Sequence, residues 1–422
     1  MIVNHDYDVV VIGGGPAGSA ASTILADKGW KVLLLEKEKF PRYHIGESLL
    51  PYGYFVLEKI GMLPAMKESA FTRKYSVQFV STDGSASIPF YFHTHLEHEA
   101  AQTWQVRREV FDQMLLDNAR NHGVAVQEQV AVRDLVQQDR QVVGVIAQPK
   151  EGEPIEYRAR MTIDASGRDA LSMHKNGWRV KDPALNKMAV WTYYKGALRD
   201  PGIDEGATTV AYVPQKGWFW YIPQEDDIVS VGIVAEPSYL YRDGRDPQKI
   251  FQREINNNRW IHEHLTPGTQ TGGYHHTGDY SYRSRFCALD GLVLIGDAFA
   301  FLDPVFSSGV FLALKTADLA SEVVHQCLQD GDVSASRFSD YGETTCQGIE
   351  AMRSLVYAFY DQAFSFGKLI RKYPHLKGDV TDCLIGNVLI DFTEMQNAMA
   401  EFASLPKPLP HGRALVGSGI AG

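Results

Sequence analysis

Closely spaced glycines directly after an apolar stretch could bind a phosphate-bearing ligand. Residues 7–12 read as a strand, and glycines with the G-x-G-x-x-G spacing lead from it into a helix-forming segment. Glycine permits the tight turn, and the free N–H groups at a helix N-terminus favour an anion. The candidate binding residues of this turn are Gly13, Gly15, Pro16, Ala17 and Gly18. The pattern predicts a dinucleotide site.

A carboxylate follows the next apolar strand along the chain. Residues 31–35 form this second strand, and Glu36 ends it. In dinucleotide-binding βαβ units an acidic residue at this place holds the ribose hydroxyls. Because the strand, the helix, the second strand and the acid are all present, dinucleotide binding is much better supported than by the glycines alone.

Two later strand ends also carry acidic residues. Asp164 ends an apolar strand and is followed by a small-residue turn with Gly167, and Gly296-Asp297-Ala298 follows the apolar residues 292–295. Ligands bind outside the carboxyl ends of strands in parallel sheets. Taken singly, each segment also fits a plain strand end. Together with the opening glycines, they predict three parts of one nucleotide site.

The elements that must position these residues come from distant parts of the chain. We expect helices near residues 54–60, 105–121 and 309–328, and strands near 124–132 and 141–147 that are joined by a turn at Asp139-Arg140. Residues 185–240 are rich in Trp, Tyr and Val, have turns at Pro201-Gly202 and Lys216-Gly217, and predict an antiparallel sheet inserted in the nucleotide fold. One amphipathic helix is expected near residues 247–263.

The predicted organisation is therefore an α/β nucleotide-binding domain, an inserted sheet and a helical C-terminal region. Residues 406–410 read as part of a loose tail. The nucleotide domain is expected over 1–75, 101–180 and 280–330, the sheet domain over 76–100 and 181–279, and the C-terminal region over 331–422.

Composition excludes several classes of function. The net charge is −10 and no Lys/Arg-rich block occurs, which argues against nucleic acid and anionic membrane surfaces. The longest apolar runs have strand length, so no membrane span is expected. Four cysteines without metal-ligand spacing read as free thiols of a cytoplasmic protein, and the strand that begins near residue 7 leaves no room for a signal peptide.

The polar loop 93–102 contains three histidines that could in principle bind a metal. His93, His95 and His98 have the spacing H-x-H-x-x-H, but no carboxylate or cysteine pattern accompanies them. Solvated loop histidines are the better interpretation, and no metal is expected.

Two motifs bear on the reaction itself. The strand-like segment 217–223 contains W-x-W-x-I-P, whose alternation places Trp218, Trp220 and Ile222 on one face. In the segment 301–309, Pro304 and a Ser-Ser-Gly turn precede a predicted helix, whose backbone N–H groups could hold a small anion. Core packing and a helix capped by Ser308 are the structural alternatives.

The three nucleotide segments together resemble the glutathione-reductase-like FAD fold of the flavoprotein monooxygenases. Arg108, in a V-x-R-x-x-F-D stretch, matches the arginine that lies near the flavin in that group. The implied fold is an FAD-binding domain of the Rossmann type. The cofactor-binding residues implied, with those above, are Glu36, Lys37, Arg42, Ser48, Arg108, Asp164, Gly167, Gly296, Asp297 and Gly309.

The reaction motifs resemble those of the flavin-dependent halogenases. W-x-W-x-I-P, F-x-x-P-x-x-S-x-G and the loop F-P-R-x-x-I-G-E-S-L-L-P at 40–51 carry this resemblance, which runs from about residue 5 to 390. It implies that reduced FAD and oxygen form a C4a-hydroperoxide, which chloride or bromide attacks to give hypohalous acid. The halide would lie by Ser308 and Gly309. The oxidant would then reach a lysine through a tunnel lined by Trp218, Trp220, Ile222, Pro223, Pro304 and Phe306.

Lys74 has the position of that lysine, but Ser76 stands where the family has glycine. A solvated surface lysine is the structural alternative. Phe306 occupies the place where tryptophan halogenases have a glutamate, which favours a phenol, a pyrrole or another ring activated by its own heteroatom. The resemblance implies a substrate that is free or tethered to an acyl carrier protein, and a separate flavin reductase.

Two other enzyme classes share parts of these motifs. A geranylgeranyl-reductase-like alkene reductase would hold a prenyl chain against the aromatic strand. An FAD-dependent aromatic hydroxylase would have a P-x-G-x-G turn after Gly-Asp-Ala, and residues 303–309 do not match it. A flavin-binding protein without enzymatic activity is the remaining class. The halogenase is the leading hypothesis.

Overall fold

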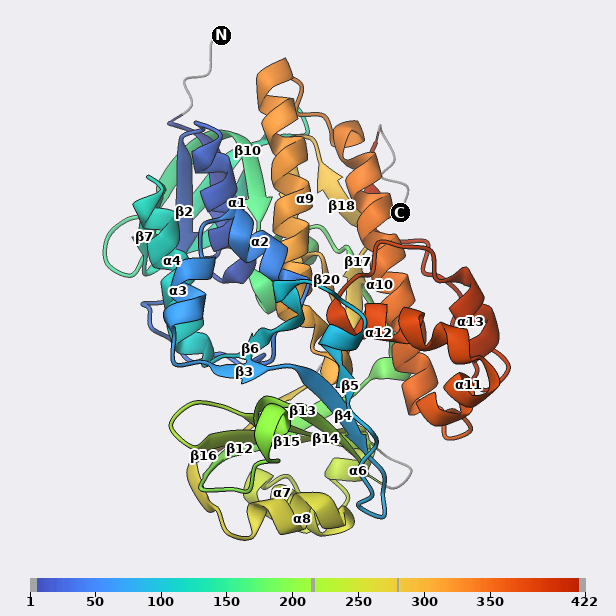
Figure 1. Ribbon diagram of the computed structural model, residues 1–422. Helices are drawn as coiled ribbons and strands as arrows, with labels where there is room; N and C mark the ends of the chain where they lie inside the picture. Colours follow the sequence, from blue (N-terminus) through green and yellow to red (C-terminus); the bar gives the residue numbers. More distant parts are fainter. Residues whose placement is uncertain (1–5, 214–216, 279–280, 417–422) are drawn as a thin grey trace.

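A mostly parallel sheet forms the centre of the nucleotide-binding half. The computed structural model describes residues 6–213, 217–278 and 281–416 (Figure 1). The sheet order is β21-β18-β19-β10-β1-β2-β7, and β19, β10, β1, β2 and β7 run parallel. These parallel strands are β1 (Tyr7–Ile12), β2 (Val32–Glu36), β7 (Ala125–Glu128), β10 (Ile155–Asp164) and β19 (Leu292–Leu294). Helices pack on one face of the sheet and Val130, Val145 and Ala147 pack on the other, so its inner strands are apolar on both faces.

A hairpin extends this sheet beyond β10. β8 (Val130–Gln138) and β9 (Gln141–Pro149) are antiparallel, and β9 pairs with the first half of β10. Asp139 and Arg140 connect them with φ values of 49° and 73°. Both central residues of a type I′ turn have positive φ, which confirms the turn expected at this dipeptide.

Three helices pack on one face of the parallel sheet. α1 (Pro16–Asp27) contacts both α4 (Arg108–Asn121) and α9 (Ser308–Asp330), as Figure 1 shows. α2 (Gly53–Lys59) lies against α9, and α3 (Leu63–Glu68) follows it. α2, α4 and α9 confirm the expected helices within a few residues, whereas α3 was not predicted. The short ribbon of β3 (Thr72–Lys74) and β6 (Thr103–Gln105) connects this half to the second sheet.

The second sheet has the order β16-β12-β15-β14-β13-β4-β5. Its strands are β4 (Ser76–Val80), β5 (Phe90–Tyr91), β12 (Met188–Lys195), β13 (Thr208–Val213), β14 (Gly217–Pro223), β15 (Ile228–Ala235) and β16 (Thr269–Gly278). The expected antiparallel pairing is correct except between β4 and β13, which are parallel. Parallel pairing is possible here because the long connection through the nucleotide half returns the chain in the same direction. The turn expected at Lys216-Gly217 begins outside the described residues.

Two helices, and not one, cover the far side of the second sheet. α7 (Pro247–Glu254) and α8 (Arg259–Leu265) are separated at Asn258, whose side-chain oxygen accepts from the N–H of Ile261 at 3.2 Å. The expected single helix is therefore wrong. The Asn258 amide also donates to the carbonyls of Ser81 and Tyr212, both at 3.0 Å, and these bonds fix the break between the helices.

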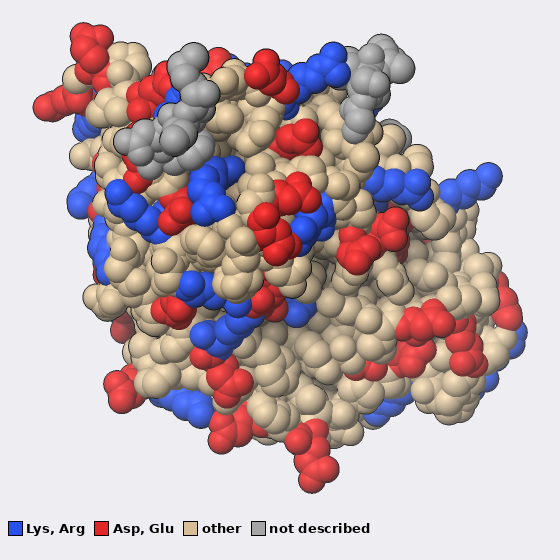
Figure 2. All heavy atoms as spheres, turned by 90° about the horizontal axis from the view of Figure 1, so that it is seen from above, with Lys and Arg blue, Asp and Glu red and all other residues tan. Residues whose placement is uncertain are grey.

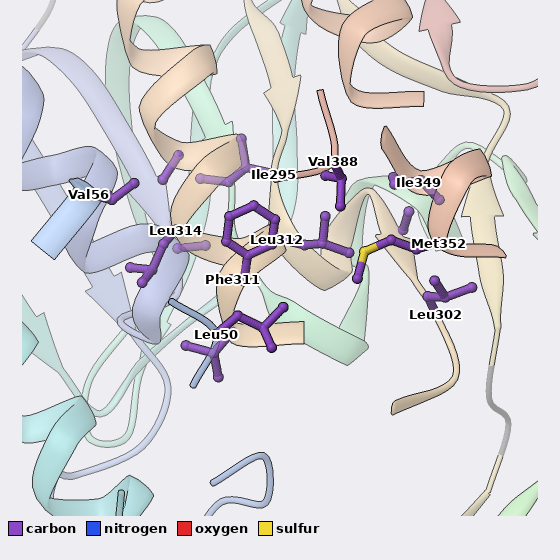
Figure 3. Packing of buried hydrophobic residues seen from close by; sticks show 14 of the residues in the cluster. Leu50, Val56, Ile295, Leu302, Phe311, Leu312, Leu314, Ile349, Met352 and Val388 are labelled. Atoms are coloured by element: carbon purple, nitrogen blue, oxygen red, sulfur yellow. The ribbon is translucent and has the colours of Figure 1, made fainter. Parts of the chain in front are cut away.

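The C-terminal region packs on the nucleotide half through α9 and α10. Figure 3 shows Phe311 and Leu312 of α9 among Ile349, Met352 and Val388 from the C-terminal region. The helices here are α10 (Ser339–Tyr360), α11 (Phe366–Lys372), α12 (Lys377–Ile385) and α13 (Thr393–Met399). This contact buries Ile349 and Met352 of α10 in the interior of the molecule.

The tail after residue 406 is tied to the central sheet, which corrects the expectation of a loose tail. β21 (Arg413–Ala414) pairs in parallel with β18 (Phe286–Leu289), and Leu415 N–H donates to Ala288 O at 2.9 Å. The Arg353 guanidinium also donates to the Lys407 carbonyl at 3.1 Å. Residues 417–422 lie outside the described part.

The remaining elements are short. They are β11 (Arg179–Lys181), β17 (Tyr282–Ser284), β20 (Ala300–Phe301), α5 (Leu171–Lys175) and α6 (Pro237–Leu240), with single 3-10 turns between them. Over the described ranges, no helix combines the length and the apolar character needed to cross a bilayer. Acidic and basic side chains are interspersed on the face seen from above (Figure 2).

Candidate active site

A cavity of about 560 Å³ lies between the nucleotide half and the second sheet. It extends from the glycine turn, past the loop 42–48 and the α9 N-terminus, to the face of β14. The residues predicted from sequence that line it are Gly13, Gly15, Pro16, Ala17, Glu36, Lys37, Arg42, Ser48, Arg108, Gly167, Trp218, Trp220, Ile222, Asp297, Pro304 and Gly309. The fold thus brings distant motifs to one surface.

The glycine turn shapes one end of this cavity. Gly13 has φ +99°, and a Cβ there would lie 2.5 Å from the Ala165 carbonyl oxygen. A Cβ on Gly18 would lie 1.9 Å from the Gly13 oxygen, so Gly18 serves strand–helix packing and does not line the cavity. At Gly15 an added Cβ would meet only the Arg42 guanidinium, at 3.5 Å. The N-terminus of α1 is consequently open to an anionic ligand.

Glu36 is a buried carboxylate at the same end. Its Oε2 accepts from the Gly14 N–H at 2.7 Å and its Oε1 from the Glu38 N–H at 2.8 Å. These bonds fix the carboxylate beside the glycine turn. Each oxygen keeps a further acceptor position that a ribose hydroxyl could use.

Asp112 joins two arginines under the loop 42–48. Arg108 donates to both Asp112 oxygens, at 2.8 and 3.0 Å, and Arg42 donates to Oδ2 at 3.1 Å. Arg108 also donates to the carbonyls of Ile45 and Gly46 at 2.7 and 3.2 Å. The arginine therefore holds the loop as well as lining the cavity.

Two residues predicted to bind the cofactor contact neighbouring protein groups. The Asp164 side chain accepts from the N–H groups of Ser166 and Ser172, at 3.0 and 2.7 Å, and does not line the cavity. Gly296 has φ +58° and packs against Ala17 and Ala313. Neither residue lines the cavity, and a role of Asp164 or Gly296 in cofactor binding stays a prediction.

Asp297 is the acidic residue that does line the cavity here. Burial raises the pKa of its carboxyl to about 6, although the charges of Arg168 and Arg108 oppose this rise. Tyr282 donates to its main-chain carbonyl at 3.0 Å. A carboxyl in this place could accept from a hydroxyl of a bound ligand.

A tryptophan wall closes the other end of the cavity. Trp218 and Trp220 are buried on one face of β14, with ring centroids 6.1 Å apart, as the alternation predicts. Trp218 Nε1 donates to Tyr360 of α10 at 2.9 Å, and Tyr360 donates to the Asp303 carboxylate at 2.8 Å. Burial raises the pKa of Asp303 to about 6. Pro223, also expected in this wall, does not line the cavity.

The α9 N-terminus forms the third side. Ser307, with φ 56°, precedes the helix, and Ser308 is its first residue, which corrects the expected cap. Ser307 and Gly309 line the cavity, whereas the Ser308 side chain is buried outside it. Phe306 also lies outside, against Phe359 and Phe366 at ring distances of 5.8 and 6.3 Å.

Lys74 is buried beside the cavity and does not line it. Only 1% of its surface is exposed, which excludes the solvated alternative. Its Nζ donates to Ser48 Oγ at 2.9 Å and to Leu49 O at 3.1 Å, and lies 5.4 Å from the centre of the Phe92 ring. Burial lowers the pKa of Lys74 to about 7. Ser76, in the family's glycine position, donates away from it to Asp204 at 2.9 Å.

This lowered pKa predicts that stability rises with pH. Lysine titrates near 10.5 when exposed and near 7 here, so between these values the unfolded state binds the additional proton. Relative to Lys74→Met, the free energy of unfolding of the natural protein should rise by up to about 1.4 kcal/mol per pH unit above pH 7. Urea denaturation of both proteins between about pH 7 and pH 9 measures this. A difference that does not change with pH would contradict the prediction.

Sequence reasoning missed several residues around the cavity. Glu47, Tyr43 and Thr208 line it, and Tyr193 donates to Glu47 at 2.9 Å. Burial raises the pKa of Glu47. Glu47 belongs to the loop motif at 40–51, so the sequence contained a signal for it, whereas Thr208 belongs to no motif.

The histidines of the loop 93–102 bond to nearby protein groups. His95 pairs with Asp382 at 3.0 Å, and the His98 side chain caps a 3-10 turn.

The cavity fits an elongated dinucleotide. It has an open helix N-terminus at one end, a buried carboxylate beside that turn, and an apolar wall at the other end. The glycines leave no side chain in the space that a pyrophosphate would take. The arrangement fits FAD.

Comparisons with known proteins agree with this geometry. The FAD binding domain family model matches residues 6–341. A pyrrole-2-carbonyl-[peptidyl-carrier protein] chlorinase from Pseudomonas fluorescens is 31% identical over 97% of this chain and 96% of its own, and the corresponding brominase from Pseudoalteromonas luteoviolacea is 33% identical over 94% and 97%. The solved flavin-dependent brominase Bmp2 is 30% identical over 94% and 97%, with a TM-score of 0.85. The chain therefore belongs to the flavin-dependent halogenases, enzymes that use FAD and a halide.

Proposed function

We propose that this enzyme halogenates an electron-rich aromatic ring, either a pyrrole or a phenol, with hypohalous acid directed by Lys74. The observation that carries the proposal is the burial of Lys74 next to a cavity that joins a dinucleotide turn to a tryptophan wall. Among the described residues no carboxylate pairs with this ammonium, and a buried, unpaired charge is costly, which supports a role for Lys74 in the reaction.

The cofactor would lie along the cavity. The α1 N-terminus would face its pyrophosphate and Glu36 a ribose, while Lys37, Arg42 and Arg108 line the same path. Bound reduced FAD would supply the oxidising power that it draws from oxygen. Because the chain has one dinucleotide turn, we propose that a separate flavin reductase supplies the reduced flavin. The free cysteines support a cytoplasmic setting.

The halide would lie at the N-terminus of α9. The first N–H groups of a helix have no partner within the helix, and Gly309 presents its backbone to the cavity without a side chain. Chloride or bromide beside Gly309 would therefore be stabilised by backbone donors and by the helix dipole. Pro304 restricts the same end of the cavity.

The substrate ring would be activated by its own heteroatom. Phe306 packs among phenylalanines and supplies no carboxylate near Lys74. Relatives that act on pyrrole rings attached to a carrier protein favour a pyrrole carried in the same way. A free phenol is the second candidate, since it is also activated without help from an acidic side chain.

The decisive experiment supplies the enzyme with FAD, a flavin reductase, NADH, oxygen and bromide. Pyrrole-2-carbonyl groups on a carrier protein are compared with free phenols, pyrroles and indoles, and products are identified by mass spectrometry. A brominated pyrrole or phenol is expected. Hydroxylated or saturated products without any halogenated ring would overturn the proposal in favour of a hydroxylase or an alkene reductase.

A further inference from the structure

Two buried hydroxyl groups, those of Ser48 and Thr208, separate Lys74 from the cavity. Lys74 Nζ donates to Ser48 Oγ at 2.9 Å, and Ser48 Oγ lies 2.8 Å from Thr208 Oγ1. Ser48 and Thr208 line the cavity, whereas Lys74 does not. At least 96% of the surface of each of the three residues is buried, so bulk water does not compete for these bonds. The lysine meets the cavity through two hydroxyl groups.

Gln105 sets the direction of the bonds at Thr208. Its Nε2 donates to the Gly206 carbonyl and to Thr208 Oγ1, both at 2.9 Å. The Gly206 carbonyl accepts only, so the amide nitrogen must be on this side. Thr208 therefore uses one acceptor position for Gln105, and its own proton is left for Ser48 or for a group in the cavity.

The remaining donor and acceptor positions of Ser48 and Thr208 form a consistent proton path. When Lys74 is charged, Ser48 accepts from it and donates to the second acceptor position of Thr208. The Thr208 hydroxyl then donates into the cavity. When Lys74 is neutral, each bond can reverse, and the path accepts a proton from the cavity.

We propose that Lys74 acts as a general acid through Ser48 and Thr208, and that Thr208 is the group that donates to the oxidant. This proposal rests on the proposed function and deepens it. Thr208 is a catalytic residue, because its hydroxyl would touch the hypohalous acid. Gln105 is a positioning residue, because it acts by orienting Thr208.

The proposed step balances as follows. The ring carbon forms a bond to the halogen of hypohalous acid while the O–X bond breaks. The departing oxygen takes the Thr208 proton and leaves as water; Ser48 then reprotonates Thr208, and Lys74 reprotonates Ser48. The proton lost from the halogenated ring carbon restores the charge of Lys74. No N–X bond forms at the lysine.

The surroundings of Lys74 favour this use. The Leu49 carbonyl accepts a second hydrogen bond from Lys74 Nζ, and the Phe92 ring lies over the ammonium. The nearby Asp204 carboxylate accepts from Ser76 Oγ at 2.9 Å. Burial lowers the pKa of Lys74 to about 7, so both forms of the path are populated near neutral pH.

Thr208→Val tests the path without removing volume. We expect the halogenated product to fall by at least about 100-fold, as for loss of a general acid, while reoxidation of the flavin continues. Thr208→Ser keeps the hydroxyl and should retain activity. Thr209→Val is the matched control: Thr209 points to the opposite face of β13, does not line the cavity and accepts from Gln78 at 2.8 Å.

A measurement on the flavin-free protein distinguishes loss of the proton path from a general disruption of the structure by the substitution. The pH dependence of Lys74 acylation, followed by peptide mass spectrometry, reports its pKa. Ser48→Ala removes an acceptor of the ammonium and should lower that pKa, whereas Thr208→Val should leave it unchanged. Full halogenation by Thr208→Val, or a halogenated Lys74 Nζ trapped without substrate, would overturn the path. Absence of halogenation in the natural protein would instead overturn the proposed function.

Discussion

Lys74→Met is expected to abolish halogenation while oxidation of reduced flavin continues. The lysine is the cationic group that contacts Ser48 at the cavity wall, and no carboxylate of the described residues forms an ion pair with its buried ammonium. Methionine fills a similar volume and has no proton to donate. Loss of a general acid costs about 100- to 10,000-fold in rate. Product formation by mass spectrometry and NADH consumption, measured together, separate the two steps.

Lys67→Met is the matched control for this substitution. Its side chain is 51% exposed and pairs with Glu99 at 2.7 Å, away from the cavity. An exposed ion pair contributes about 0–1 kcal/mol, so both rates should stay near those of the natural protein. Unchanged halogenation in Lys74→Met would remove this lysine from the mechanism. Loss of both rates would instead indicate loss of cofactor binding.

Asp112→Ala is expected to destabilise the protein by about 3–5 kcal/mol, as for a broken buried ion pair. The carboxylate is fully buried and accepts from Arg108 at 2.8 Å and from Arg42 at 3.1 Å. Its loss leaves the buried Arg108 guanidinium without its carboxylate and releases Arg42 at the cavity. Since Arg108 also holds the loop 42–48, FAD affinity should fall as well. Urea denaturation and flavin fluorescence titration measure the two effects.

A neighbouring aspartate on α4 provides the control. Asp117 is half exposed and pairs with Arg120 at 2.6 Å on the surface. Asp117→Ala should change the free energy of unfolding by about 0.5 kcal/mol or less. Equal effects of the two substitutions would show that Asp112 contributes no more than a surface pair.

The nucleotide half could be predicted from sequence because its signals are local. Apolar strands that end in glycine or acid, such as residues 7–12, are specified by neighbouring residues alone. The Asp139-Arg140 turn and the alternation of Trp218 and Trp220 are local in the same sense. Their structures agree with expectation since propensity and burial favour the same conformation.

The errors concern pairing between distant segments. The parallel contact of β4 with β13, the break at Asn258 and the strand at Arg413–Ala414 depend on partners far along the chain. Strand periodicity does not state which strand lies alongside, or in which direction. A proline-rich tail looks loose until an exposed strand edge provides its hydrogen bonds.

In the functional site, too, some features follow from local motifs and others only from contacts between distant segments. The sequence by itself determined the glycine turn, Glu36 and the tryptophan strand, because each belongs to a short motif with chemical meaning, whereas Lys74 was predicted only through the family resemblance. Only the tertiary structure decided that Lys74 is buried behind Ser48, that Ser48 bonds to Thr208 at the cavity wall, and that the Asp164 carboxylate accepts from the N–H of Ser172. The physical reason is that burial and hydrogen-bond partners arise when the two sheets meet, and no local pattern encodes that contact.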